Sequence, residues 1–201
     1  FVKEKKKETK RFVFTFRWRE LDRSYKLFIL VSFVFALGNS SDVFLILRAK
    51  NLGFSTISTI FAYVLYNLTY ALFSFPVGIV SDRIGPRKVL ASGFLIFTVV
   101  YLLFGIINRS FFLWLLFPVY GIYMAFTEGI GKAYIAGIGP PEKSGTAFGF
   151  YQTVIGLRTF FASLVAGLLW TYVSPQAPFI FGSAMALVAG LIFMIWGRRK
   201  C

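Results

Sequence analysis

The sequence predicts an all-α membrane protein with six transmembrane helices. Of its 201 residues, 57% are hydrophobic, which is more than an ordinary soluble domain contains. Several runs of about 18 to 25 residues carry few or no charges, and a helix of that length crosses a hydrocarbon core of about 30 Å. These runs are continuous and do not alternate in short segments of about ten residues. They therefore indicate helices, not the strands of a transmembrane barrel.

Six helices are predicted along the chain. They cover Lys26–Leu47, Thr56–Val80, Val89–Ile107, Phe111–Ile138, Gly145–Tyr172 and Pro178–Trp196. Each break contains residues that end helices, namely Asn51-Leu52-Gly53, Gly85-Pro86, Asn108-Arg109-Ser110, Gly139-Pro140-Pro141 and Ser174-Pro175. Because the breaks are short, neighbouring helices are expected to run antiparallel. The predicted division is a basic and aromatic linker at 1–25, a six-helix bundle at 26–197 and a tail at 198–201.

The 22 Lys and Arg residues divide unequally between the two ends of the predicted helices. Seventeen lie at the end where the chain termini fall, including ten in the first 26 residues and three between positions 80 and 89. The opposite end has only Arg48, Lys50 and Arg109. The positive-inside rule then predicts that both termini are cytoplasmic. The net charge of +14 follows from this topology, so nucleic acid is not expected as a partner.

The residue inventory excludes several functional classes. Histidine is absent and the single cysteine is Cys201, which excludes histidine zinc sites, cysteine metal clusters and an internal disulfide. Nothing in the sequence assembles a nucleophile, a base and a metal, so neither an enzyme nor a cofactor is predicted. The chain begins at Phe1 and not at a methionine, which suggests a fragment or a processed chain.

Four ionisable residues lie inside the predicted spans, where a charge is costly and marks a candidate functional position. Glu128 and Lys132 are four residues apart on one helix and can pair. The pair either makes two buried charges tolerable or provides a carboxylate that exchanges partners or a proton. Arg158 has no acidic residue on its own span, so its partner is expected to be Glu128 or an anionic substrate. Asp42 is either a hydrated position near the outer mouth or a proton-coupling site.

Uncharged polar residues on the first, second and fifth spans predict that these helices line a cavity. Those on the second span recur at helical spacing and form one stripe. Each group of polar residues alone also fits hydrogen bonding between helices. Taken together with the charged residues of the spans, the groups favour a cavity. The candidate cavity residues are Asn39, Tyr63, Asn67, Tyr70 and Tyr151, in addition to the four ionisable residues.

Two further patterns concern packing. Gly121, Ala125 and Gly129 recur at four-residue steps on the fourth span, which allows a neighbouring helix to approach closely. The third and sixth spans carry no ionisable residue and are therefore expected at the periphery of the bundle, facing lipid.

A predicted ten-residue loop, Val80–Val89, joins the second and third spans. With the residues before it, it has the pattern Gly78-x-x-Ser81-Asp82-Arg83-x-Gly85-x-Arg87-Lys88. This pattern resembles the signature G-x-x-x-D-R-x-G-R-[KR] of major facilitator superfamily transporters, with Pro86 where a basic residue is common. A second stretch, from Thr127 to Trp170, resembles the fourth and fifth helices of the carboxy-terminal half in many prokaryotic members.

The resemblance implies a fold of two six-helix halves, each built of two inverted three-helix repeats. This chain would be the carboxy-terminal half, in a prokaryotic cytoplasmic (inner) membrane, with the lipid bilayer and a missing amino-terminal half as partners. The implied function is secondary active transport of a small drug-like or metabolite solute by alternating access. Proton coupling through Glu128 or Asp42 is expected, with a uniporter as the alternative. The motif residues would latch the cytoplasmic side; they are Gly78, Asp82, Arg83, Gly85, Arg87 and Lys88.

Two alternatives remain from the sequence. One is a membrane sensor or scaffold that keeps this fold without transporting. The other is a complete six-helix protein that dimerises.

Overall fold

The computed structural model of the protein describes residues 23–138 and 144–196, and no strand occurs among them. The helices are α1 (Arg23–Gly38), α2 (Val43–Asn51), α3 (Thr56–Ile84), α4 (Pro86–Ile106), η2 (Ser110–Phe112), α5 (Leu113–Ile138), α6 (Ser144–Tyr172) and α7 (Ala177–Trp196). Six segments are long and apolar enough to cross a membrane, with α1 and α2 together forming the first. The predicted all-α, six-span fold class is confirmed.

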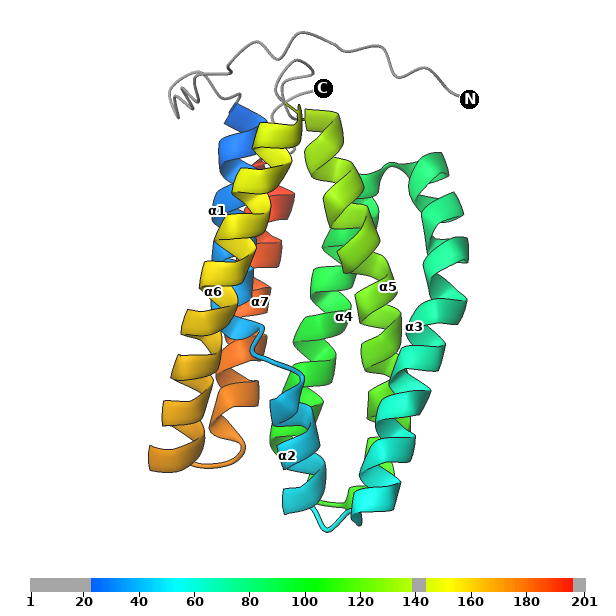
Figure 1. The fold of residues 1–201 in the computed structure, drawn as a ribbon, viewed down its shortest axis with the longest axis vertical. Coiled ribbons are helices and arrows are strands. Elements are labelled where there is room, and N and C mark those ends of the chain that lie inside the picture. The colour runs from blue at the N-terminus through cyan, green and yellow to red at the C-terminus, as the bar shows by residue number, and fades with distance from the viewer. Residues whose placement is uncertain (1–22, 139–143, 197–201) are drawn as a thin grey trace, which may run out of the picture.

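The helices form two groups of three (Figure 1). One group contains α3, α4 and α5, and the other contains α1, α6 and α7. α4 packs directly against α7 and joins the groups, while α3 packs on α5 and α1 on α7. Helix ends that the sequence assigns to the cytoplasmic side, such as the start of α1 and the end of α5, lie at one end of the bundle.

The third and sixth spans, α4 and α7, are more central in the described bundle than the sequence predicts. In the most apolar stretch of each helix, 50% of the residues of α4 and 44% of those of α7 are buried. The corresponding share is 17% in α3 and 11% in α6. Within the described residues α4 and α7 form the seam between the two groups, and their predicted position facing lipid remains a prediction. Both still present one exposed apolar side, which includes Leu95, Val99, Leu187 and Leu191.

The first span is broken, whereas the sequence predicts one continuous helix at Lys26–Leu47. α1 ends at Gly38 and α2 begins at Val43, which leaves the segment Asn39–Asp42 between them. Ser, Asn and Asp side chains compete with the helical backbone for hydrogen bonds and favour such breaks. Here the backbone N–H of Ser41 donates to the hydroxyl of Ser163 on α6 at 3.3 Å. The break therefore follows from a cluster of weak helix formers that the apolar flanks conceal.

The predicted ten-residue loop between the second and third spans is wrong. α3 continues to Ile84 and α4 starts at Pro86, so Gly85 is the only non-helical residue between them. Its φ of 91° lies in the region that a residue without Cβ adopts at low cost. Pro86 has the fixed φ that suits a first helical position. A glycine followed by a proline thus turns the chain in one residue.

The motif around this turn is tied to the last helix. Arg87 donates from Nη2 to the carbonyl of Phe193 at 3.1 Å, and its guanidinium lies 5.6 Å from the centre of that ring. A cation at the end of α7 also interacts favourably with the helix dipole. Asp82, Arg83 and Lys88 are exposed, and Gly78 lies within α3. The predicted latch function of this motif remains a prediction.

Arg48 ties the opposite end of the bundle together. The sequence places Arg48 just outside the first predicted span, but in the structure this residue is only 1% exposed. Its Nε donates to the carbonyl of Phe104 at 3.0 Å and its Nη2 to that of Ile107 at 2.9 Å, while Nη1 donates to Asn51 Oδ1 at 2.7 Å. The carbonyl of Phe104 belongs to the last turn of α4, which leaves its acceptors without a partner in the helix, and Ile107 is the residue directly after it. Arg48 is therefore a side-chain cap for α4.

Candidate solute-binding pocket

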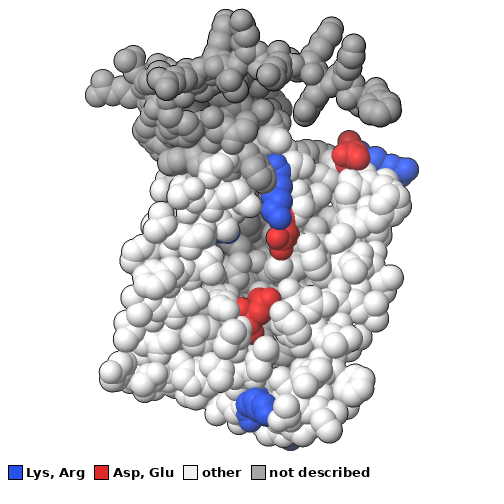
Figure 2. All heavy atoms as spheres, viewed as in Figure 1, with Lys and Arg blue, Asp and Glu red and all other residues white. Residues whose placement is uncertain are grey.

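A polar pocket of about 250 Å³ lies between α1, α5 and α6, with α4 at its back. Figure 2 shows that the face in view carries few charges, and that acidic and basic side chains follow a hollow near its middle. The pocket residues are Phe28, Ser32, Phe35, Asn39, Leu90, Phe94, Tyr123, Met124, Thr127, Glu128, Gly131, Lys132, Tyr151, Gln152, Ile155 and Arg158. Five of the nine predicted cavity residues are thus brought together: Asn39, Glu128, Lys132, Tyr151 and Arg158.

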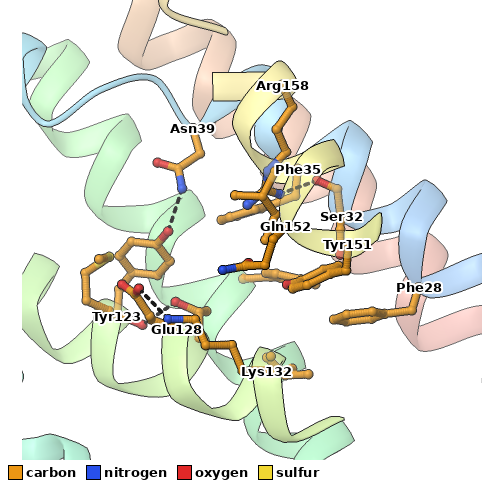
Figure 3. A pocket seen from close by; sticks show the side chains of 16 residues that line it. Phe28, Ser32, Phe35, Asn39, Tyr123, Glu128, Lys132, Tyr151, Gln152 and Arg158 are labelled. Atoms are coloured by element: carbon orange, nitrogen blue, oxygen red, sulfur yellow. Dashed lines mark hydrogen bonds and ion pairs between the residues drawn. The ribbon is translucent and has the colours of Figure 1, made fainter. Parts of the chain in front are cut away.

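Glu128 and Lys132 form the expected pair on α5. Lys132 Nζ lies 3.0 Å from Glu128 Oε1, and the two side chains are 43% and 40% exposed. Both charges are therefore open to the pocket (Figure 3). A pair at this exposure contributes little to stability, so stability alone does not explain it.

Arg158 enters the pocket from α6. It donates from Nη1 to the carbonyl of Ser32 on α1 at 2.7 Å, which fixes the guanidinium across the two helices. The predicted ion pair with Glu128 does not occur among the described residues, because this carbonyl holds Arg158 on the α1 side. Its Nε is buried and has no hydrogen-bond acceptor in the described chain. Arg158 thus places a positive charge in the wall of the pocket.

Asn39 and Tyr151 complete the predicted members of the pocket. Asn39 is the first residue of the break after α1, and its Nδ2 donates to the hydroxyl of Tyr123 on α5 at 2.9 Å. Tyr151 is buried on α6, with its ring stacked 5.9 Å from that of Phe28. Figure 3 shows these side chains around the same space as Glu128 and Arg158.

Asp42 lies beside the pocket and does not line it. Its two carboxylate oxygens accept hydrogen bonds from tyrosines of different helices. Tyr120 on α5 donates to Oδ1 at 2.8 Å, and Tyr66 on α3 donates to Oδ2 at 3.2 Å. Asp42 thus has defined protein partners, while the two predicted roles, a hydrated position and a proton-coupling site, remain predictions.

The polar stripe on the second span does not line this pocket, and its place at a cavity remains a prediction. Asn67 bonds to the carbonyl of Tyr63 within α3, and the Tyr63 ring contacts that of Tyr66. Tyr70 is half-buried against the core. Because α3 packs on the side of α5 away from α6, its polar residues face elsewhere.

Four polar side chains of the pocket were not among the predicted cavity residues: Ser32, Tyr123, Thr127 and Gln152. A signal exists for two of them. Tyr123 and Thr127 are four residues apart on α5 and share a helix face, and they lie five residues before Glu128 and Lys132 respectively. Ser32 is recognisable only once Arg158 contacts its carbonyl, because a lone serine in an apolar helix carries no distinguishing pattern.

The comparisons with known proteins agree with this architecture. A sequence profile described as Major Facilitator Superfamily matches residues 27–200. An uncharacterized MFS-type transporter of Methanocaldococcus jannaschii is 40% identical over 96% of this chain and 50% of its own length. A D-arabinitol transporter of Klebsiella pneumoniae is 29% identical over 81% of this chain and 40% of its own length. A ribitol transporter of Klebsiella pneumoniae is 34% identical over 63% of this chain and 31% of its own length.

This chain therefore spans half or less of the length of these relatives. The profile match covers most of the chain, and six apolar helices identify an integral membrane protein. The chain belongs to the major facilitator superfamily of membrane transporters.

Proposed function

We propose that this chain is the carboxy-terminal half of a secondary transporter that moves a small polyhydroxylated solute by alternating access. The observation that carries the proposal is the polar pocket, which Arg158 of α6 lines together with the open pair of Glu128 and Lys132 on α5. A missing amino-terminal half would cover the exposed faces of α3 and α6 and complete the site. The cytoplasmic location of both termini belongs to the same proposal.

The chemistry of the pocket favours a polyol or a sugar-like metabolite over a lipophilic drug. A carboxylate accepts hydrogen bonds, a guanidinium donates them, and the amides of Asn39 and Gln152 do both. Together they match a solute with a hydroxyl on every carbon. Two relatives are named for five-carbon sugar alcohols, which supports the same class.

Replacement of Arg158 tests the proposal. In proteoliposomes that contain the full-length protein, Arg158→Met is expected to lower the initial rate of labelled ribitol or D-arabinitol uptake by about 10- to 100-fold. A hydrogen bond from a charged group is worth about 1.5–3 kcal/mol, and its loss has this effect. Arg109→Met is the matched control, since Arg109 is exposed outside the pocket, and its rate should stay near that of the wild type. Equal rates for the two variants, or no polyol uptake by the wild type, would refute the proposal.

Glu128 is the proposed proton-coupling group. Its carboxylate shares a hydrogen bond with Lys132 that a neutral carboxyl would weaken, so protonation would release Lys132. Glu128→Gln keeps the shape and removes the titration. We expect it to abolish stimulation of uptake by an imposed pH gradient while downhill exchange continues. Unchanged dependence on the pH gradient would show that the coupling lies elsewhere.

A further inference from the structure

The charges of the solute pocket do not balance within the described residues. Its lining includes two cations, Lys132 and Arg158, and one anion, Glu128. Lys132 Nζ lies 3.0 Å from Glu128 Oε1, so these two residues are neutral as a pair. The charge of Arg158 therefore remains as a net positive charge in the wall of the pocket.

No carboxylate of the described chain is placed to neutralise Arg158. The described residues include three acidic side chains. Glu128 is already paired, Asp42 accepts hydrogen bonds from two tyrosines, and Asp82 is exposed in the last turn of α3. Arg158 donates instead to the carbonyl of Ser32 at 2.7 Å, and that carbonyl carries no net charge. A charge inside a membrane span is costly and marks a functional position, so the missing counter-charge needs an explanation.

Uncharged hydrogen-bonding groups line the same space. They are the amides of Asn39 and Gln152 and the hydroxyls of Thr127 and Tyr151. Figure 3 shows that Arg158 extends from α6, while the neutral pair extends from α5. A ligand that matches this arrangement has one anionic end, for the guanidinium, and hydroxyl groups along the rest of its length.

We propose that the preferred solute is a polyhydroxy acid, which is a chain of hydroxylated carbons that ends in one carboxylate. The carboxylate would lie at Arg158, because a hydrogen bond between two charged groups is roughly twice as strong as a neutral one. A monocarboxylate balances one net positive charge, whereas a phosphate monoester carries close to two negative charges near pH 7. This inference rests on the proposed function, since it specifies the solute of the same pocket.

Competition between neutral and anionic solutes tests this inference. Proteoliposomes that contain the full-length protein would exchange labelled ribitol, at equal pH on both sides, against unlabelled ribitol, ribonate or ribitol phosphate. Ribonate has the hydroxylated carbon chain of ribitol with a carboxylate at one end. We expect ribonate to reach half-inhibition at about one tenth of the ribitol concentration, which is the gain typical of one added charged hydrogen bond. Exchange of labelled ribonate is measured in parallel.

Arg158→Gln is the deciding variant. Glutamine retains an N–H that can donate to the carbonyl of Ser32, but it carries no charge. We expect the half-inhibitory concentrations of ribonate and ribitol to come within about twofold of each other in this variant. Arg158→Lys keeps the charge and should retain the preference for ribonate. Arg109→Gln is the matched control, because it removes an exposed cation outside the pocket and should leave the preference unchanged.

Three results would overturn the inference. The first is inhibition by ribonate that is no stronger than inhibition by ribitol, as expected if an acidic residue of the missing half pairs with Arg158. The second is stronger inhibition by ribitol phosphate than by ribonate. The third is an Arg158→Gln variant with the wild-type preference. In all three cases the wild type still exchanges ribitol, so the proposed function stands, whereas a wild type that exchanges neither ribitol nor ribonate refutes both.

Discussion

Gly121→Ala is expected to destabilise the protein by about 1–3 kcal/mol, the usual cost of forcing extra atoms into a packed contact. Gly121 lies where α5 crosses α3. A Cβ there would overlap with the carbonyl oxygen of Tyr66 and would lie 3.0 Å from both Thr69 Cβ and Tyr70 N. Two of these three atoms belong to the backbone, so no side-chain rotation relieves the clash and the helices must separate.

Gly129→Ala provides a control with the opposite sign. Gly129 lies two turns further along the same helix, and a Cβ there meets nothing within 4 Å. Alanine in a helix interior is more favourable than glycine by roughly 0.5–1 kcal/mol. Unfolding of both variants in mixed micelles with increasing SDS would measure the difference. A Gly121→Ala variant as stable as Gly129→Ala would show that α3 and α5 do not approach this closely.

Arg48→Met is expected to lower the free energy of unfolding by about 3–5 kcal/mol, because several buried acceptors lose a charged donor at once. The carbonyls of Phe104 and Ile107 and the side chain of Asn51 all bond to Arg48. Methionine has a similar length and fills most of the space, so the loss reports mainly on the hydrogen bonds. The same SDS unfolding assay measures the effect.

Two further variants separate charge from geometry at this end of the bundle. Arg48→Lys keeps the positive charge but lacks the planar fork, so it should recover only part of the loss. Lys50→Met removes an exposed cation two residues away and should change stability by no more than about 0.5 kcal/mol. Equal effects of Arg48→Met and Lys50→Met would contradict the capping role.

The sequence predicts the six spans because their signal is local. A helix that crosses a membrane needs an uninterrupted apolar run, and such runs are visible without knowledge of the fold. The costly charges Glu128, Lys132 and Arg158 are visible for the same reason, and the structure gathers all three around one pocket. Their grouping was predictable because a charge in a span is excluded from lipid and must face the interior.

The short connections were predicted less well. The segment from Val80 to Val89 contains charges and a Gly-Pro pair, which resemble a loop, yet all but Gly85 is helical. Charged residues at a membrane boundary fit the last turn of a helix as well as a loop, so composition does not distinguish the two. The break at Asn39–Asp42 shows the opposite error, because a continuous helix was predicted where the structure has none. Long apolar stretches on both sides favoured that prediction, although these four residues are weak helix formers.

By itself, the sequence determined the number of spans, the family signature and the chemical character of the pocket. Each depends on residue type or on spacing within one helix. Only the tertiary structure decided that Arg48 caps α4, that Arg158 contacts the carbonyl of Ser32, and that Asp42 meets the tyrosines of two other helices. These contacts join residues 24 to 126 positions apart. They depend on how helices cross, and that is set by packing at sites such as Gly121, where a backbone can approach.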